Sequence, residues 1–129
     1  MVAPFPTDQV FIGGQWRAPT GGGVLATVNP SAGRRLGSLA AGAAADVDAA
    51  VRAARAALDG TWGAMTAVER GRILARMGRE VEARIDLLAE LEALDVGKPL
   101  KQARNDVIAL ARYLEFYAGA ADKLHGETI

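Results

Sequence analysis

The chain has 129 residues, of which 50% are apolar and 23% charged, so it can form one ordinary domain with a core. Fifteen basic side chains balance fifteen acidic ones, which excludes the strong positive field of a protein that binds nucleic acid or an anionic membrane. The absence of cysteine excludes disulfides, thiolate metal sites and a cysteine nucleophile within these 129 residues.

No run of residues has the apolar length needed to cross a bilayer. Residues 1–9 lack the basic region followed by an apolar run that is typical of a signal peptide. The expected location is therefore the cytoplasm, with no membrane and no nucleic acid among the partners.

The first part of the chain, to about residue 42, has the pattern of short β-strands. Residues 10–12 and 15–16 flank Gly13 and Gly14, a pair suited to the positive φ angles of a hairpin turn. Residues 24–28 and 36–39 are further extended segments, and the turn-forming run 29–33 follows the first of them. Because small β ribbons are not stable alone, these strands need another surface to cover them.

From Asp46 onward the apolar spacing becomes helical. Asp46 and Asp48 suit the positive end of the dipole of a first helix, and Gly60 suits its end. Thr66 and Glu69 have the spacing of a capping box at the start of the next helical stretch.

This second stretch runs to Gly97 and Pro99, and its length is compatible with one helix or with two, the second capped by Asp86. A third helix is expected from about Pro99, with an apolar face made of Ala103, Val107, Leu110, Leu114, Tyr117 and Ala121. The segment is thus predicted to be mostly helical, with three long helices after a short N-terminal β-hairpin region.

The larger aromatic side chains are interpreted as packing residues and not as a ligand-binding box. They are Trp16, Trp62, Tyr113, Phe116 and Tyr117. His125 has no cysteine or second histidine with which to form a metal site, so an exposed or capping role is expected.

Several stretches, taken in order, resemble the opening of the aldehyde dehydrogenase superfamily. They are residues 11–16, 28–33, 46–51, 69–70, 94–100 and 117–126. The resemblance is closest to the betaine-aldehyde-like or general aldehyde branch. It implies an α/β family fold, in which residues 1–129 form the N-terminal part of the cofactor-binding domain and stop before the dinucleotide-binding turn and the catalytic domain.

The resemblance also implies the chemistry of the complete enzyme. A cysteine thiolate attacks the aldehyde, hydride passes to NAD or NADP, and a water activated by a glutamate hydrolyses the thioester. An oxyanion hole formed partly by an asparagine side chain holds the developing charge. The sequence has no cysteine and no strand followed by G-x-G-x-x-G at the start of a helix. No catalytic or cofactor-binding residue is therefore expected in this chain.

One partial site is implied by the same resemblance. Members of the family hold a monovalent cation, and the matching ligands here are the backbone carbonyls of Thr27 and Val28 and the carboxylate of Asp95. The ion would be potassium or sodium in a structural role. The alternative interpretation is that Asp95 lies in the last turn of a helix and pairs with Lys98.

The third helix of the family lines the mouth of the substrate tunnel, and the matching positions are Asn105 and Ala109. The alternative is an ordinary helix face in solvent.

Two functions follow from these observations. In the first, the chain is the N-terminal segment of an NAD(P)-dependent aldehyde dehydrogenase, which oxidises an aldehyde to a carboxylic acid. The segment alone would be inactive, and the complete enzyme would bind aldehyde and NAD(P) and form a homo-oligomer. In the second, it is a non-catalytic remnant or a helical interaction module that pairs with full-length subunits. Both leave apolar helix and strand surfaces that need a partner.

Overall fold

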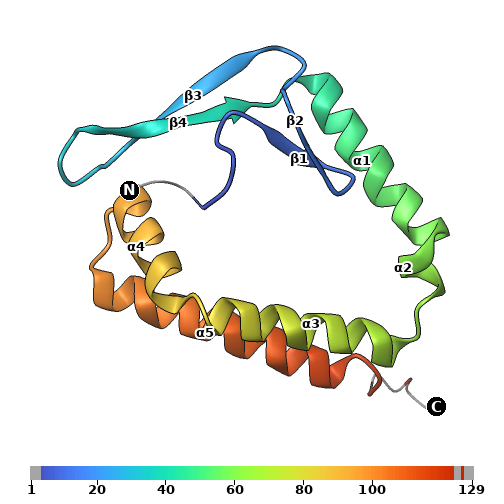
Figure 1. Ribbon diagram of the computed structural model, residues 1–129. Helices are drawn as coiled ribbons and strands as arrows, with labels where there is room; N and C mark the ends of the chain where they lie inside the picture. The colour runs from blue at the N-terminus through green and yellow to red at the C-terminus, as the bar shows by residue number, and fades with distance from the viewer. Residues whose placement is uncertain (1–3, 124–125, 127–129) are drawn as a thin grey trace. The chain divides into compact units, whose positions relative to one another are not determined.

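The computed structural model describes residues 4–123 and residue 126. The chain forms two compact units, Met1–Ala64 and Met65–Ile129. The strands and the first two helices belong to the first unit, and the remaining helices belong to the second (Figure 1). The prediction of a mostly helical segment after a short β-hairpin region is therefore confirmed.

The first unit begins with a tight β-hairpin. Strand β1 (Val10–Ile12) pairs antiparallel with β2 (Gln15–Arg17). Gly13 and Gly14 connect them with φ angles of 61° and 80°. Positive φ at both central residues is what a type I′ turn requires, and glycine adopts it without steric cost. The predicted hairpin is confirmed.

A second antiparallel hairpin follows, made of β3 (Gly23–Val28) and β4 (Arg35–Ala41). The register shifts between Thr27 and Val28, which marks a β-bulge or similar irregularity at that point. Such a shift interrupts the regular ladder of hydrogen bonds and bends the strand locally.

The turn between β3 and β4 is built on Asn29, which is buried. Its side-chain Oδ1 accepts hydrogen bonds from the backbone N–H groups of Ser31 (2.9 Å) and Ala32 (3.1 Å). Its own N–H donates to the carbonyl of Arg34, and its carbonyl accepts from Gly33. The predicted turn after residue 28 is thus an Asx-type turn.

Helix α1 (Ala44–Asp59) is followed by the short helix α2 (Thr61–Ala64). The first turn of α1 contains Asp46, which the sequence indicated only as a charge that suits the helix dipole. Asp46 is 3% exposed and accepts from the N–H of Ala43 at 2.9 Å. The hydroxyl of Thr20 also donates to Asp46, at 2.7 Å, and its N–H donates at 3.0 Å. These hydrogen bonds, the Thr20 hydroxyl first, hold the pKa of Asp46 below its ordinary value of 3.8.

The second unit begins with the predicted capping box. The N–H of Glu69 donates to Thr66 Oγ1 at 3.3 Å, and the N–H of Thr66 donates to Glu69 Oε2 at 2.7 Å. The box satisfies two N–H groups that have no partner within helix α3 (Ala67–Glu82), so it sets the start of that helix.

The long apolar stretch resolves into two helices, so the described residues contain four long helices where three were expected. Helix α4 (Ile85–Val96) starts after the break at residues 83–84. The prediction that Asp86 caps it is wrong, because Arg84 occupies the N-cap position and Asp86 lies in the first turn. There the carboxylate pairs with Arg104 of helix α5 (Leu100–Ala120).

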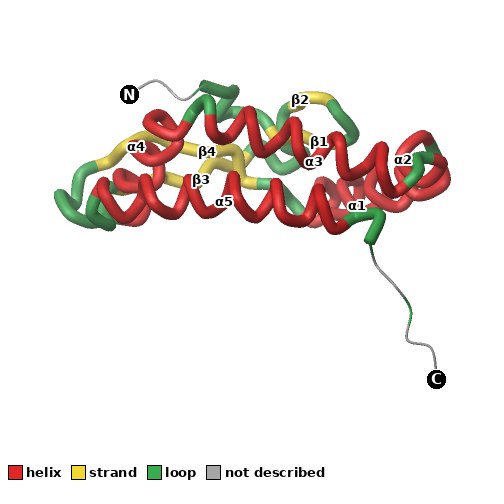
Figure 2. The backbone as a smooth tube through the Cα atoms, turned by 90° about the horizontal axis from the view of Figure 1, so that it is seen from below, coloured by secondary structure: helices red, strands yellow, loops and turns green. Residues whose placement is uncertain are grey.

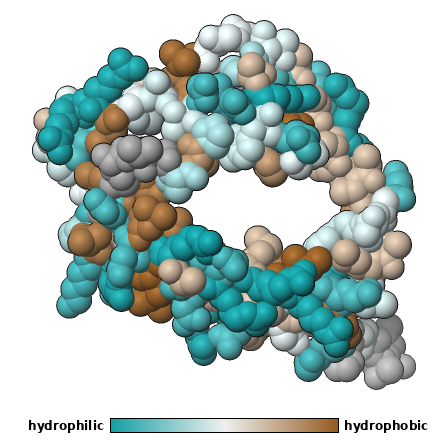
Figure 3. All heavy atoms as spheres, viewed as in Figure 1, coloured by the Kyte–Doolittle hydropathy of each residue, from teal (hydrophilic) through white to brown (hydrophobic). Residues whose placement is uncertain are grey.

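Helix α5 lies side by side with α3, and it also contacts α4 (Figure 2). The most buried apolar residues of this unit are small ones, Ala89 on α4 and Ala103, Val107 and Ala111 on α5. Partly buried side chains of α3 and α4, among them Val81 and Leu88, pack against them. Apolar atoms gather over α4 in the space-filling view (Figure 3).

The expected apolar face of α5 is only partly correct. Ala103 and Val107 are buried as predicted, but Leu110 and Tyr117 are exposed. The buried face continues instead through Ala111, one helical turn after Val107. The predicted members Leu114 and Ala121 are half-buried, Leu114 beside Gly78 and Ala121 beside Gly71 of α3.

The interpretation of the aromatic side chains as packing residues needs correction for those of α5. Tyr113, Phe116 and Tyr117 are exposed within this chain. Trp16 and Trp62 are the least exposed of the five, at 43% and 39%, and they still face solvent in part. For Trp16 the prediction holds, because its ring packs against those of Phe11 and Phe5, with centroids 5.0 Å and 6.3 Å away.

The close approach of α3 to α5 depends on glycine. A Cβ atom placed on Gly71 would lie 2.6 Å from the carbonyl oxygen of Ala118 and 3.3 Å from the Cβ of Ala121. A Cβ on Gly78 would lie 3.3 Å from the carbonyl oxygen of Ala111. The first distance is well inside van der Waals contact with backbone, so the helices would have to separate.

We therefore expect Gly71→Ala to destabilise the chain by about 1–3 kcal/mol, the usual cost of overpacking. Gly119→Ala is the matched control, because Gly119 is also helical and a Cβ placed on it would meet no atom within 4 Å. It should be neutral or stabilise by up to about 1 kcal/mol through helix propensity alone. Urea denaturation followed by circular dichroism measures both. Equal stabilities for the two variants would contradict the tight packing.

Candidate functional site

In the second unit, the resemblance predicts site residues on both sides of the connection between α4 and α5. Asp95 precedes this connection, and Asn105 and Ala109 follow it. Helix α4 ends at Gly97, which has φ 79° and donates its N–H to the carbonyl of Ala93 at 3.0 Å. Pro99 is the N-cap of α5, and its carbonyl accepts from the N–H of Gln102 at 2.9 Å. Glycine supplies the left-handed cap and proline the fixed φ, so the chain reverses direction within residues 97–99.

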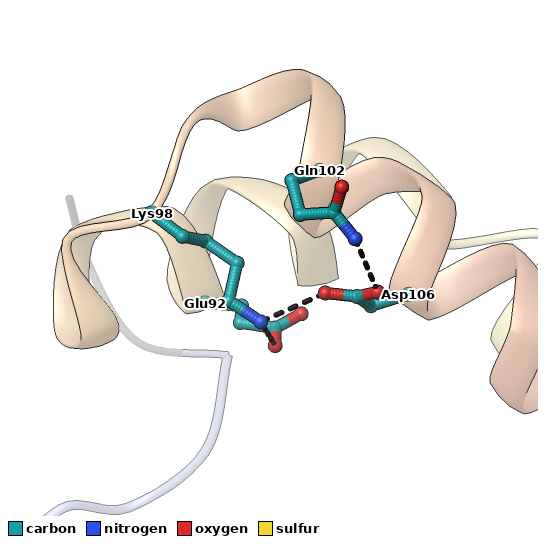
Figure 4. A network of polar contacts seen from close by, with 4 residues as sticks. All are labelled: Glu92, Lys98, Gln102 and Asp106. Atoms are coloured by element: carbon teal, nitrogen blue, oxygen red, sulfur yellow. Dashed lines mark hydrogen bonds and ion pairs between the residues drawn. The ribbon is translucent and has the colours of Figure 1, made fainter.

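Lys98 lies between these two residues and joins both helices (Figure 4). Its Nζ donates to Glu92 Oε1 of α4 at 2.5 Å and to Asp106 Oδ2 of α5 at 2.8 Å. The other carboxylate oxygen of Asp106 accepts from Gln102 Nε2 at 3.0 Å. These four residues form one network, called here the Lys98 bridge.

The bridge shifts the pKa values of its members. The hydrogen bonds from Lys98 to Asp106 and then to Glu92 raise the pKa of Lys98 above its ordinary 10.5. The hydrogen bond from Lys98 lowers the pKa of Asp106 below its ordinary 3.8, and the hydrogen bond from Gln102 adds to this. The Lys98 side chain is 25% exposed, so solvent screens the bridge less than it screens a pair in open water.

The sequence alone does not reveal the bridge. Its helical spacing places Glu92 on a solvated face, and the alternative interpretation pairs Lys98 with Asp95. The structure shows that Lys98 binds Glu92 and Asp106 instead. The i,i+4 rule indicates only the contact of Gln102 with Asp106, because Lys98 lies in the turn between the helices and its partners lie one on each side of it.

The three predicted cation ligands lie in different units. Thr27 and Val28 are on β3 at the shift in register, and Asp95 is exposed in the last turn of α4. Carbonyl and carboxylate oxygens are suitable ligands for a hard monovalent cation. Because the ligands are divided between the units, the cation site stays a prediction.

The predicted entrance residues Asn105 and Ala109 are one helical turn apart on α5, and both are exposed. They lie on the side of the helix opposite to Val107 and Ala111, as the 100° step of an α-helix requires. This placement is compatible with an entrance and with an ordinary solvent face, so the assignment stays a prediction.

Within residues 4–123 and 126, no three histidine, aspartate or glutamate side chains lie together as a metal site would require. In the same residues, no helix is at once long enough and apolar enough to span a membrane. His125 lies outside the described residues.

Comparison with known proteins gives a consistent result. The model of the aldehyde dehydrogenase family matches residues 16–129. The chain is 43% identical to the mitochondrial aldehyde dehydrogenase of Equus caballus over 125 residues, and 38% identical to an aldehyde dehydrogenase of Aspergillus niger over 120 residues. These matches cover 95% and 93% of the chain, but only 25% and 24% of the relatives.

Solved structures agree with the sequence comparison. A candidate aldehyde dehydrogenase of Burkholderia cenocepacia is 55% identical, with a TM-score of 0.89 over 92% of this chain and 25% of its own. The NAD+ complex of Bacillus cereus aldehyde dehydrogenase is 36% identical, with a TM-score of 0.90 over 96% of this chain and 26% of its own. The folded segment is thus one that occurs within aldehyde dehydrogenase structures. The chain belongs to the aldehyde dehydrogenase family, and it spans about a quarter of the length of the relatives it matches.

The Lys98 bridge should contribute to stability in a pH-dependent way. We expect Lys98→Met to lower the midpoint of thermal unfolding at neutral pH, because it leaves Glu92 and Asp106 without their cation. The pKa of Asp106 is lowered by folding, so this stabilisation is present above about pH 3.8 and is lost as the pH falls through the lower folded value. The pKa of Lys98 is raised, so its contribution is also lost as the pH rises through a value above 10.5.

Lys101→Met is the control, because it removes the same charge from an exposed position in the first turn of α5, three residues further along the chain. Thermal scans by circular dichroism across this pH range measure both variants. A Lys98→Met midpoint that equals the Lys101→Met midpoint at neutral pH would show that the bridge does not stabilise the fold.

Proposed function

We propose that this chain is the N-terminal segment of an NAD(P)-dependent aldehyde dehydrogenase that oxidises an aldehyde to a carboxylic acid, and that it is inactive alone. The observation that carries the proposal is that a chain of the aldehyde dehydrogenase family spans only about a quarter of its relatives and has no cysteine among its residues. A thiolate nucleophile must therefore come from a part of the enzyme that these residues do not include.

In the complete enzyme, NAD or NADP would accept hydride from the substrate. The described residues contain no strand–glycine turn–helix unit that could hold the pyrophosphate of such a cofactor, since β4 leads to α1 without that turn. Residues 1–129 would therefore be the part of the cofactor-binding domain that precedes the dinucleotide turn. Their role would be to support the domain and to supply one wall of the substrate entrance.

Asn105 and Ala109 would line that entrance, because both are exposed on one side of α5. Thr27, Val28 and Asp95 would contribute to a structural potassium or sodium site. The complete enzyme would be a cytoplasmic homo-oligomer. The exposed aromatic side chains of α5 also support the second candidate, a helical module that pairs with full-length subunits without catalysing a reaction.

A chimaera tests the proposal. Residues 1–129 replace the matched quarter of the Equus caballus enzyme, and oxidation of propanal is followed by NADH or NADPH absorbance. We expect the chimaera to oxidise propanal at a rate within about tenfold of the parent enzyme, a loss of about 1.4 kcal/mol or less of transition-state stabilisation. The isolated chain should give no turnover with either cofactor, since it has no nucleophile.

The parent enzyme is the control for the assay. A chimaera that folds as cooperatively as the parent but has no activity would contradict the proposed function and favour the non-catalytic module. Turnover by the isolated chain, free of host enzymes, would contradict the expected inactivity.

A further inference from the structure

The junction of α1 and α2 contains two residues that can react with each other, Asp59 and Gly60. Asp59 is the one aspartate of the sequence that glycine follows, and every other aspartate precedes a residue with a side chain. An aspartate carboxyl group can be attacked by the backbone nitrogen of the next residue. Glycine hinders this attack least, because it has no Cβ and its backbone has the widest choice of conformations. The sequence thus distinguishes one position for the reaction.

The structure leaves both reacting groups accessible. Asp59 is the last residue of α1 and Gly60 is its C-cap, and both are exposed. Within the part of the chain that the structure describes, the Asp59 carboxylate has no hydrogen-bond or ion-pair partner. The N–H of Gly60 donates to the carbonyl of Ala57 at 3.3 Å, which is long for an N–H to carbonyl hydrogen bond. Because helix ends fray, this bond opens more easily than one in the middle of α1.

The charge around Asp59 also favours the loss of its carboxylate. A helix has the negative end of its dipole at the C-terminus, where a carboxylate is disfavoured. The last turn of α1 carries no basic side chain that would compensate. A cyclic imide formed from Asp59 is neutral, so ring closure removes this repulsion.

We propose that Asp59 is a site of spontaneous isomerisation through a succinimide formed with Gly60. The backbone nitrogen of Gly60 forms a bond to Cγ of Asp59, and one carboxyl oxygen leaves as water with the amide proton and the acid proton. Water then opens the ring at either carbonyl carbon. Attack at Cγ restores aspartate, whereas attack at the backbone carbonyl carbon gives isoaspartate, with the chain linked through Cβ and Cγ. One water is lost and one is gained, so no other reactant is needed and the mass is unchanged.

The isomer would alter the turn into α2, because it lengthens the backbone by one methylene. This turn is already tight, since a Cβ placed on Gly63 would lie 1.7 Å from the carbonyl oxygen of Leu58. The N–H of Ala64 donates to the carbonyl of Gly60 at 3.1 Å. A longer backbone at residue 59 shifts Gly60 relative to both contacts. Isomerisation should therefore loosen α2, the four residues that end the first unit.

Ageing of the purified chain in mildly acidic buffer at body temperature tests the proposal. Trypsin releases residues 56–70, in which Asp59 is the only aspartate, and electron-transfer fragmentation distinguishes isoaspartate from aspartate. Gly60→Ala is the matched variant. The φ of −105° at this position suits alanine, and the added Cβ would lie 3.3 Å from the carbonyl oxygen of Ala56, so the backbone can stay in place while the attack is hindered.

In the wild-type chain, isoaspartate should accumulate at Asp59 about tenfold or more faster than at Asp48, the exposed aspartate of α1 that precedes alanine. Gly60→Ala should slow the reaction at Asp59 by about tenfold or more for the same reason. Hydrogen exchange of the amides of residues 61–64 should be faster in the isomerised chain than in the fresh one.

Equal rates at Asp59 and Asp48, or in the wild type and Gly60→Ala, would overturn the proposal. So would a chain that stays unmodified while a synthetic peptide of residues 56–70 isomerises, because the end of α1 would then protect Asp59. The experiment measures no turnover, so its outcome is independent of the proposed function.

Discussion

The close packing of small residues between α3 and α5 is the constraint on which the second unit depends. Gly71 lies so near the backbone of α5 that even a methyl group would meet the Ala118 carbonyl. Between these helices lie Ala103, Val107 and Ala111, which are buried, together with the half-buried Leu114 beside Gly78. Leu110, Tyr113, Phe116 and Tyr117 of α5 remain exposed.

Local polar networks fix the ends of the elements that this packing brings together. The Thr66–Glu69 capping box sets the start of α3, and Gly97 and Pro99 set the turn into α5. The Lys98 bridge then connects α4 and α5 across that turn. In the first unit, Asp46 has a similar role, because its carboxylate holds the N-terminus of α1 and the loop at Thr20 together. Each network stabilises a connection that the apolar core leaves unsupported.

Much of this fold could be predicted because the signals are local in sequence. Gly13–Gly14, Asn29–Pro30, Thr66 with Glu69, and Gly97 with Pro99 each determine the backbone within a few residues, and all appear in the structure as expected. The Lys98 bridge and the Thr20–Asp46 contact join residues whose proximity depends on tertiary structure, so their spacing carries no signal. The sequence also could not show which face of α5 is buried. The helical spacing of its apolar residues fits a face that includes Leu110 and Tyr117 as well as the observed face through Ala103, Val107 and Ala111. Which face is buried depends on the glycines of α3.

The proposed function implies that this segment acquires its full packing only within a complete aldehyde dehydrogenase. Hydrogen exchange of the backbone amides around residues 110–117, measured by mass spectrometry in the isolated chain and in the chimaera, tests this most directly. If the rest of the enzyme covers the exposed apolar side chains of α5, exchange of these amides should slow by orders of magnitude in the chimaera, while α5 frays in the isolated chain. Equal protection in the two proteins would contradict the claim, because α5 would then be as stable without the remaining three quarters as with them.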